Sequence, residues 1–119
     1  TYTNLEETGT DAAEELLAAL FPFDSSEPML VNEQTLAAVK EAVSGGAKLR
    51  IFGYTDKFGE EEYNERLARK RAEAIANILK LSPDNYEIII PGESKYPNDI
   101  PYLRIFNRSV YIKILRDIQ

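Results

Sequence analysis

Residues 53–72, GYTDKFGEEEYNERLARKRA, join a glycine-bounded turn to the beginning of a long helix. Apolar residues at helical spacing predict that the helix runs from Glu60 to Leu81, with three glutamates in a first turn where the helix dipole favours anions. Upstream, Ala47 to Phe52 alternates apolar and polar side chains, which predicts a strand. The stretch therefore predicts a strand, a turn and a helix in direct succession.

The other elements are predicted outward from this unit. Asn32 is a favourable N-cap for a helix over Glu33–Ser44, which Gly45-Gly46 ends. The remaining patterns predict a short helix at Asp11–Leu20 and strands at Phe21–Phe23, Tyr86–Ile90 and Arg108–Leu115. Residues 91–107 show no period and hold three prolines, which predicts a long irregular loop of a kind that is often functional. This order predicts helices packed on one sheet.

Composition excludes several classes of protein. A chain of 119 residues with 44% hydrophobic and 29% charged residues fits one globular domain. Because the chain has no Cys and no His, thiolate chemistry, histidine triads and histidine metal sites are excluded. The net charge of -6 argues against binding to nucleic acid or to anionic lipids, and no apolar run reaches the ~20 residues that insertion into a membrane needs.

Arg71 is out of place on the predicted long helix. At about 100° per residue, Asn64, Arg71 and Ile78 fall within about 20° of one line, and this line lies in the apolar stripe. A guanidinium cannot lose its proton, so on that face it needs an anion or a carbonyl oxygen as its partner. The nearest candidate is Asp56, in the turn that leads into the same helix.

Hydrogen-bond donors surround this pair: Thr55, the amide of Asn64, and the N–H groups of the turn and the helix start. One anion, one cation and several donors complement a zwitterion, with its ammonium on Asp56 and its carboxylate in the two-pronged fork of Arg71. The alternative is a structural pair that pins the turn to the helix. The turn lacks the Gly-Lys-Ser/Thr ending of a phosphate loop, and its aromatic residues could either stack on a sugar or pack internally.

The same residues resemble the signature of OmpA-like domains, which occur in outer-membrane protein A, peptidoglycan-associated lipoprotein and flagellar stator proteins. The family pattern is roughly G-H-T-D-x-x-G followed by N-x-x-L-S-x-x-R-A. The matching positions are Gly53, Thr55, Asp56, Gly59, Asn64, Leu67, Arg71 and Ala72, and Gly92-Glu93, Pro97-Asn98, Arg104 and Asn107-Arg108 resemble the family's later motifs. Tyr54, Ala68 and Ser109 depart from the pattern, in place of His, Ser and a second Arg.

The resemblance implies an α+β sandwich of β-α-β-α-β-β order, with two main helices on a mixed sheet. The domain would span residues 21–119, and residues 1–20 would form a leader with the extra N-terminal helix. It also implies a pocket for diaminopimelate, a zwitterion of the peptidoglycan stem peptide. The family's ligand-binding positions correspond to Asp56 and Arg71, assisted by Asn64, Thr55 and Gly59 and supported by Asn107 and Arg108.

Functionally, the resemblance implies a non-enzymatic module in the periplasm that anchors an outer-membrane or envelope protein to the cell wall. No cofactor or metal is expected, and the expected partners are the stem peptide and other envelope proteins. Two rivals stay open: a module of the same fold with a vestigial pocket that binds proteins, and a small hydrolase, for which no carboxylate pair is evident.

Overall fold

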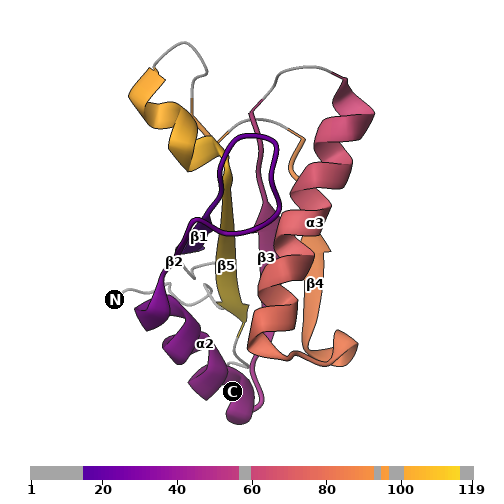
Figure 1. Cartoon of the computed structure of the whole chain (residues 1–119). Helices are drawn as coiled ribbons and strands as arrows, with labels where there is room; N and C mark the ends of the chain where they lie inside the picture. Colours follow the sequence, from indigo (N-terminus) through magenta and orange to yellow (C-terminus); the bar gives the residue numbers. More distant parts are fainter. Residues whose placement is uncertain (1–14, 57–59, 93–94, 97–100, 116–119) are drawn as a thin grey trace, which may run out of the picture.

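The computed structural model describes residues 15–56, 60–92, 95–96 and 101–115, and its framework is a mixed sheet of five strands in the order β2-β1-β5-β3-β4 (Figure 1). The strands are β1 (Glu15–Leu20), β2 (Leu30–Val31), β3 (Lys48–Gly53), β4 (Tyr86–Ile89) and β5 (Ser109–Leu115). Only β3 and β4 pair in parallel, and the other neighbours are antiparallel. The predicted α+β class with a mixed sheet is confirmed.

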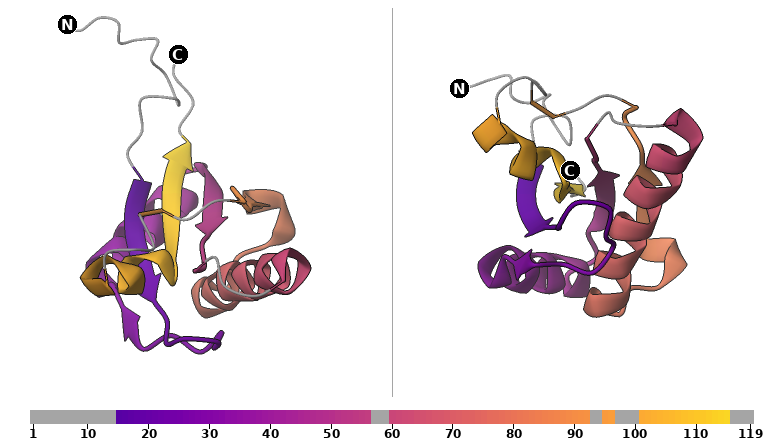
Figure 2. Two further views of the ribbon diagram at one scale, coloured as in Figure 1. Left: turned by 90° about the horizontal axis from the view of Figure 1, so that it is seen from above. Right: turned by 45° about the horizontal axis from the view of Figure 1, so that its top comes forward.

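Two helices, α2 (Glu33–Ser44) and α3 (Glu61–Leu79), pack on the same face of this sheet (Figures 1 and 2). Their apolar stripes meet the inward side chains of β3 and β5 in one buried cluster, which includes Val39, Ile51, Ile75 and Ile112. The side-chain oxygen of Asn32 accepts a hydrogen bond from Thr35 N at 3.3 Å, so the predicted N-cap is confirmed. The predicted bounds of these two helices lie within two residues of the observed bounds.

The predicted helix at residues 11–20 is wrong where the structure describes it, because Glu15–Leu20 forms β1. The apolar run suits either a buried strand or one helix face, and the periodicity does not separate the two. Pairing decides the outcome, since β1 lies between β2 and β5 and its residues Ala18 and Ala19 are completely buried. Residues of the predicted leader thus belong to the sheet, and residues 1–14 lie outside the described part.

Two smaller predictions are also corrected. The strand expected at residues 21–23 does not form, because β1 ends at Leu20, although Phe21 N still donates to Arg108 O at 2.7 Å. Pro22 lacks an N–H group and cannot extend the ladder. The loop predicted as irregular includes the 3-10 helix η3 (Pro101–Asn107), and another 3-10 turn, η2 (Pro83–Asn85), precedes β4.

Gly53, at the end of β3, brings the sheet unusually close to α3. A Cβ atom at this position would lie 2.2 Å from the backbone oxygen of Ala68, far inside contact distance. Glycine is therefore required for the close approach of strand and helix. Because Tyr54, Thr55 and Asp56 follow directly, this contact fixes where the turn begins relative to α3.

Candidate functional site

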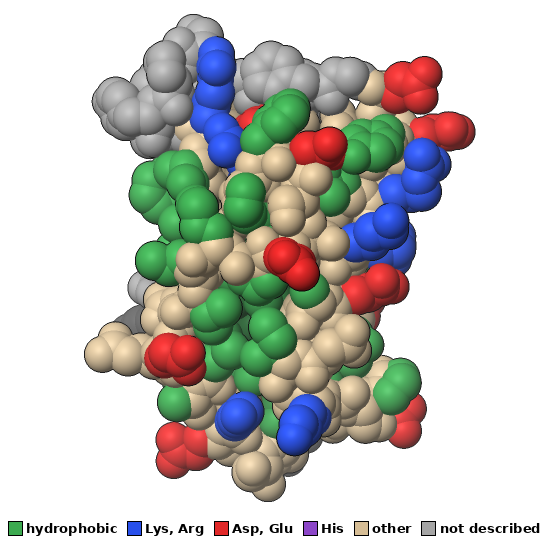
Figure 3. Space-filling model, in the orientation of Figure 1, with side chains coloured by type: hydrophobic (Ala, Val, Ile, Leu, Met, Phe, Trp, Pro, Cys, Tyr) green, Lys and Arg blue, Asp and Glu red, His purple; other side chains and the backbone are tan. Residues whose placement is uncertain are grey.

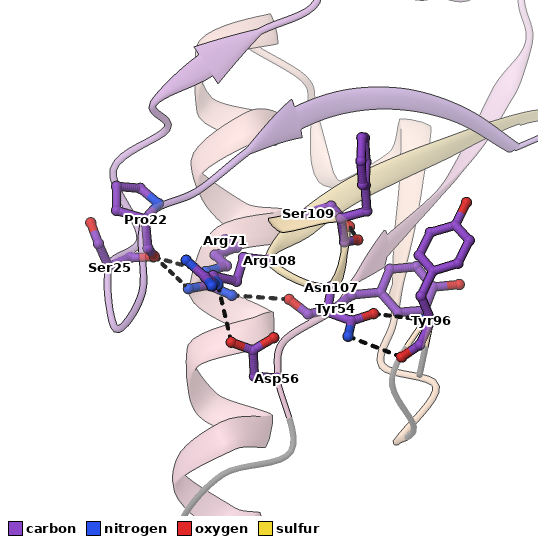
Figure 4. Close-up of polar contacts among 10 residues, drawn as sticks. Pro22, Ser25, Tyr54, Asp56, Arg71, Tyr96, Asn107, Arg108 and Ser109 are labelled. Atoms are coloured by element: carbon purple, nitrogen blue, oxygen red, sulfur yellow. Dashed lines mark hydrogen bonds and ion pairs between the residues drawn. The ribbon is translucent and has the colours of Figure 1, made fainter. Parts of the chain in front are cut away.

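Arg71 is fully buried in the middle of α3, with no exposed surface. Its guanidinium donates three hydrogen bonds to backbone oxygens: Nε to Ser25 at 2.8 Å, Nη1 to Tyr54 at 3.1 Å and Nη2 to Pro22 at 3.0 Å (Figure 4). These oxygens belong to the β1–β2 loop and to the segment after β3. Arg71 therefore holds two loops against α3, which agrees with the structural alternative given above for this residue.

Asp56 is also buried, but its direct partner is Arg108 rather than Arg71. Arg108 Nε lies 3.0 Å from Asp56 Oδ2, and the expected direct Asp56–Arg71 pair is corrected accordingly (Figure 4). The reason is that backbone carbonyl oxygens already occupy the guanidinium of Arg71. The other carboxylate oxygen, Asp56 Oδ1, is buried without a hydrogen-bond partner in the described part of the chain.

Burial changes the acid–base behaviour of Arg71. Removal from water disfavours the charged form, the positive charge of Arg108 acts in the same direction, and the pKa of Arg71 is lowered to about 10. The negative charge of Asp56 opposes this shift. At neutral pH the guanidinium still carries its full charge, so it presents a fixed cation beside the half-satisfied carboxylate.

Nine residues line a small recess around these groups, of about 40 Å³, called here the charged pocket. They are Phe23, Asp24, Thr55, Asp56, Tyr63, Asn64, Leu67, Arg71 and Arg108. Among the described lining residues, two carboxylates and two guanidiniums thus face one recess, with one amide and two hydroxyl groups beside them. Five of the seven predicted site residues, Thr55, Asp56, Asn64, Arg71 and Arg108, come together there.

Of the other two predicted site residues, only Asn107 is described, and it is not among the residues that line the charged pocket. Asn107 is fully buried, and its side chain accepts from Tyr96 N at 2.6 Å and donates to Tyr96 O at 3.0 Å (Figure 4). It holds the end of the β4–β5 connection in place, one residue before Arg108. Gly59 lies outside the described residues.

Four lining residues were not predicted as site residues from the sequence: Phe23, Asp24, Tyr63 and Leu67. Asp24 has a positive φ of 58°, and its carboxylate accepts a hydrogen bond from the Tyr63 hydroxyl, which links the β1–β2 loop to the first turn of α3. The same hydrogen bond raises the pKa of Tyr63 above its ordinary value of 10.0. In the sequence, Phe23-Asp24-Ser25 resembles the end of the family's first strand, and this resemblance was the signal available for Phe23 and Asp24.

A larger cavity of about 390 Å³ lies on the other side of the turn and is called here the acidic cavity. Its lining residues are Gly53, Tyr54, Thr55, Asp56, Glu61, Asn64, Glu65, Ala68, Ile90 and Gly92. Thr55, Asp56 and Asn64 line both recesses, so they form the wall between them.

Within the described residues, no cluster of three or more acidic, histidine or cysteine side chains is arranged to hold a metal ion. No helix in that part of the chain has the length and apolar character to cross a bilayer.

The chain folds as a mixed sheet with two helices, and it buries paired charges around a small recess. These features are those of an α+β binding domain. The model of the OmpA family matches residues 20–94, and the chain belongs to this family. The matched residues include Asp56, Asn64 and Arg71 and end before Asn107 and Arg108. As a member of this family the domain is a structural or binding module, not an enzyme.

Similar proteins support the same assignment. The outer-membrane lipoprotein YfiB of Pseudomonas aeruginosa is 42% identical over 51 residues, which are 40% of this chain and 30% of that protein, so the match spans less than a third of its length. The peptidoglycan-associated lipoprotein of Burkholderia pseudomallei is 25% identical, with a TM-score of 0.63 over 82% of this chain and 89% of that chain.

Two further solved structures share the fold at lower identity. An outer-membrane protein of Borrelia burgdorferi is 22% identical, with a TM-score of 0.60 over 88% of this chain and 98% of that chain. The C-terminal domain of Helicobacter pylori MotB is 19% identical, with a TM-score of 0.58 over 82% of this chain and 84% of that chain.

Proposed function

We propose that this domain binds peptidoglycan non-covalently, with the charged pocket taking the zwitterionic end of diaminopimelate in the stem peptide. The observation that carries the proposal is the buried Asp56, which keeps one carboxylate oxygen without a partner among the described residues, next to two guanidiniums. An unpaired buried carboxylate oxygen costs free energy, and a ligand ammonium would remove that cost. A similar protein is named peptidoglycan-associated lipoprotein, which points to the same ligand class.

The roles of the individual groups follow from their charges. Asp56 Oδ1 would accept a hydrogen bond from the ligand ammonium. Arg71 is fully buried and uses all three guanidinium nitrogens on backbone oxygens, so it would act on the ligand carboxylate through its positive charge. Arg108 is partly exposed at the same recess and would add a second positive charge. Asn64 and Thr55 would supply neutral hydrogen bonds.

The proposal extends to the cellular role. Reversible binding to the cell wall would anchor an outer-membrane or envelope protein, with this domain in the periplasm. The outer-membrane lipoprotein and the peptidoglycan-associated lipoprotein that resemble the chain are envelope proteins by name, which favours that location. Other envelope proteins would be additional partners.

A second candidate is a domain of the same fold whose pocket is vestigial and which binds envelope proteins instead. The charged pocket is only about 40 Å³. One water molecule occupies about 30 Å³ in the liquid, so the pocket is little larger than one water molecule. Arg71 is also largely occupied by backbone oxygens. Both observations favour a structural role for Arg71, and the two candidates differ in whether isolated cell wall is bound at all.

Sedimentation with purified peptidoglycan sacculi tests the proposal. The native domain should co-sediment, and Asp56→Asn and Arg108→Ala should each abolish co-sedimentation while melting cooperatively. Asp84→Asn is the matched control, because Asp84 is an exposed acid outside both recesses, and it should bind like the native protein. A native domain that stays in the supernatant supports the vestigial pocket, and unchanged binding of both pocket variants would refute the site.

A further inference from the structure

The ammonium group of Lys95 is surrounded by two aromatic rings and a carboxylate. Its Nζ lies 2.8 Å from Glu15 Oε1, 4.4 Å from the centre of the Tyr111 ring and 5.3 Å from the centre of the Tyr54 ring. The two rings meet edge to face, with their centres 5.8 Å apart. Glu15, Tyr54 and Tyr111 are called here the ammonium cage.

The strands of the sheet bring the ammonium cage together on the face opposite α2 and α3. Tyr111 of β5 lies opposite Leu17 of β1 and Phe52 of β3. Glu15 and Tyr54 each lie two residues from those positions, so strand alternation places all three cage side chains on one face. The cage is therefore a product of strand register, like the buried cluster on the other face.

The surroundings of Lys95 differ from those of the cations on α3. In Figure 3, Lys and Arg side chains project at the right, over α3, whose residues Arg66, Arg69 and Lys70 are exposed. The side chain of Lys95 is only 22% exposed. Burial raises the pKa of Tyr111 above its ordinary value of 10.0, so its ring stays uncharged at neutral pH and attracts Lys95 through its face. A partly exposed ion pair alone contributes little, and the two rings add to it.

Tyr54 connects the ammonium cage with the charged pocket. Its hydroxyl donates to Glu15 Oε1 at 3.3 Å, and its backbone N donates to Ser109 O at 3.0 Å. Its backbone oxygen accepts from Arg71 Nη1 at 3.1 Å (Figure 4). The ring of Tyr54 is thus held on one side of the sheet, while its carbonyl oxygen meets α3 on the other side. Asp56 follows only two residues later.

We propose that Lys95 is a positioning residue for the charged pocket, acting through Tyr54 from the opposite side of the sheet. The ammonium holds the Tyr54 ring, and the ring holds the backbone oxygen to which Arg71 donates. Without an ammonium in the cage, the hydrogen bond between Tyr54 and Arg71 opens more often, and the pocket binds its ligand less tightly. The effect on ligand binding rests on the proposed function, whereas the effect on Arg71 does not.

Lys95→Ala with chemical rescue tests this role in the full chain. The substitution removes three carbons and the ammonium, which are the heavy atoms of 1-propylammonium. NMR measures how fast the guanidinium protons of Arg71 exchange with water. We expect exchange to be about threefold faster or more in the variant, because cation–π contacts are lost. Added 1-propylammonium should slow it again, and the neutral 1-propanol should not. Unchanged exchange in the variant, or rescue by both compounds or by neither, would overturn the proposal.

Lys113→Ala is the matched control for this measurement. Lys113 also lies over an aromatic ring, 5.8 Å from the centre of Phe52, but not over Tyr54. Its substitution should leave the exchange of the Arg71 protons at the native rate. Acceleration equal to that in Lys95→Ala would overturn the specific role of Lys95.

Sedimentation with sacculi separates this inference from the proposed function. Lys95→Ala should bind sacculi less tightly than the native domain, by about threefold or more, for the same lost contacts. A native domain that does not sediment refutes the proposed function alone, and the exchange of the Arg71 protons then decides the role of Lys95. Native affinity in a variant with accelerated Arg71 exchange would contradict the link between Tyr54 and the pocket.

Discussion

The middle of the sheet and the end where β3 meets the turn bury opposite kinds of side chain. Between the sheet and the helices, the buried cluster consists of aliphatic residues and one phenylalanine. Beyond the end of β3, Asp56, Arg71, Asn107 and Ser109 are buried instead. Aliphatic burial stabilises a fold, whereas buried charges cost free energy unless they are fully paired. The first region therefore holds the domain together, and the second has the properties of a binding site.

The largest effect on stability is expected in the aliphatic region. Ile75→Ala removes a completely buried side chain from α3 and should lower the free energy of unfolding by about 2 to 5 kcal/mol. Ligand affinity should not change at temperatures where the variant is folded. Urea denaturation gives the stability, and calorimetry with diaminopimelate gives the affinity. A loss of affinity in the folded variant would contradict the separation of the two regions.

Arg71→Lys tests the hydrogen bonds of the polar region. Lysine keeps the positive charge but lacks the planar fork, so it cannot satisfy the oxygens of Pro22, Ser25 and Tyr54 together. We expect a loss of about 1 to 3 kcal/mol in the free energy of unfolding, for buried oxygens left without partners. Affinity for diaminopimelate should fall as well. Native stability in urea would show that these hydrogen bonds contribute nothing.

Arg108→Ala tests the ion pair with Asp56. Removing the guanidinium leaves Oδ2 unpaired in addition to Oδ1, so neither oxygen of the buried carboxylate has a partner among the described residues, which should cost about 1 to 3 kcal/mol. Asp56→Asn added to this variant should restore part of the loss, because a neutral amide is less costly to bury than an unpaired carboxylate. Chemical denaturation of the two single variants and the double variant measures the coupling. Additive losses would argue against a direct pair.

The smallest effect is expected at the Tyr63–Asp24 contact. The hydrogen bond to Asp24 is the main cause of the raised pKa of Tyr63, because it holds the proton on the phenol to higher pH. Asp24→Asn should therefore lower the pKa of Tyr63 toward 10.0 with little change in stability. NMR of the Tyr63 ring during a pH titration follows this directly. An unmoved or higher pKa would show that the hydrogen bond does not form in solution.

The aliphatic region was largely predictable from the sequence. Periodicity located α2 and α3, alternation located β3 and β5, and Asn32 was identified as an N-cap. The failure at β1 has a physical cause, because the ELLAAL run satisfies a helix face and a buried strand equally well. Only pairing with β2 and β5 selects the strand. β2 follows β1 across a loop, and β5 lies far along the chain.

For the polar region, the sequence predicted which residues come together but not which of them pair with one another. The helical position of Arg71 predicted a buried guanidinium, which is confirmed by its complete burial. Its partners are backbone oxygens, and side-chain periodicity contains no information about the path of the β1–β2 loop that supplies two of them. For the same reason the sequence did not predict the Asp56–Arg108 pair, which joins residues 52 positions apart. The acidic cavity likewise depends on the approach of β4 to α3.

Calorimetric titration of diaminopimelate into the native domain and into Asp56→Asn tests the central claim most directly. The substitution keeps the size of the side chain and removes only the charge of the half-satisfied carboxylate. Saturable heat in the native domain and none in the folded variant is the predicted result. Equal affinity in both proteins would contradict the assignment of Asp56 as the group that receives the ligand ammonium.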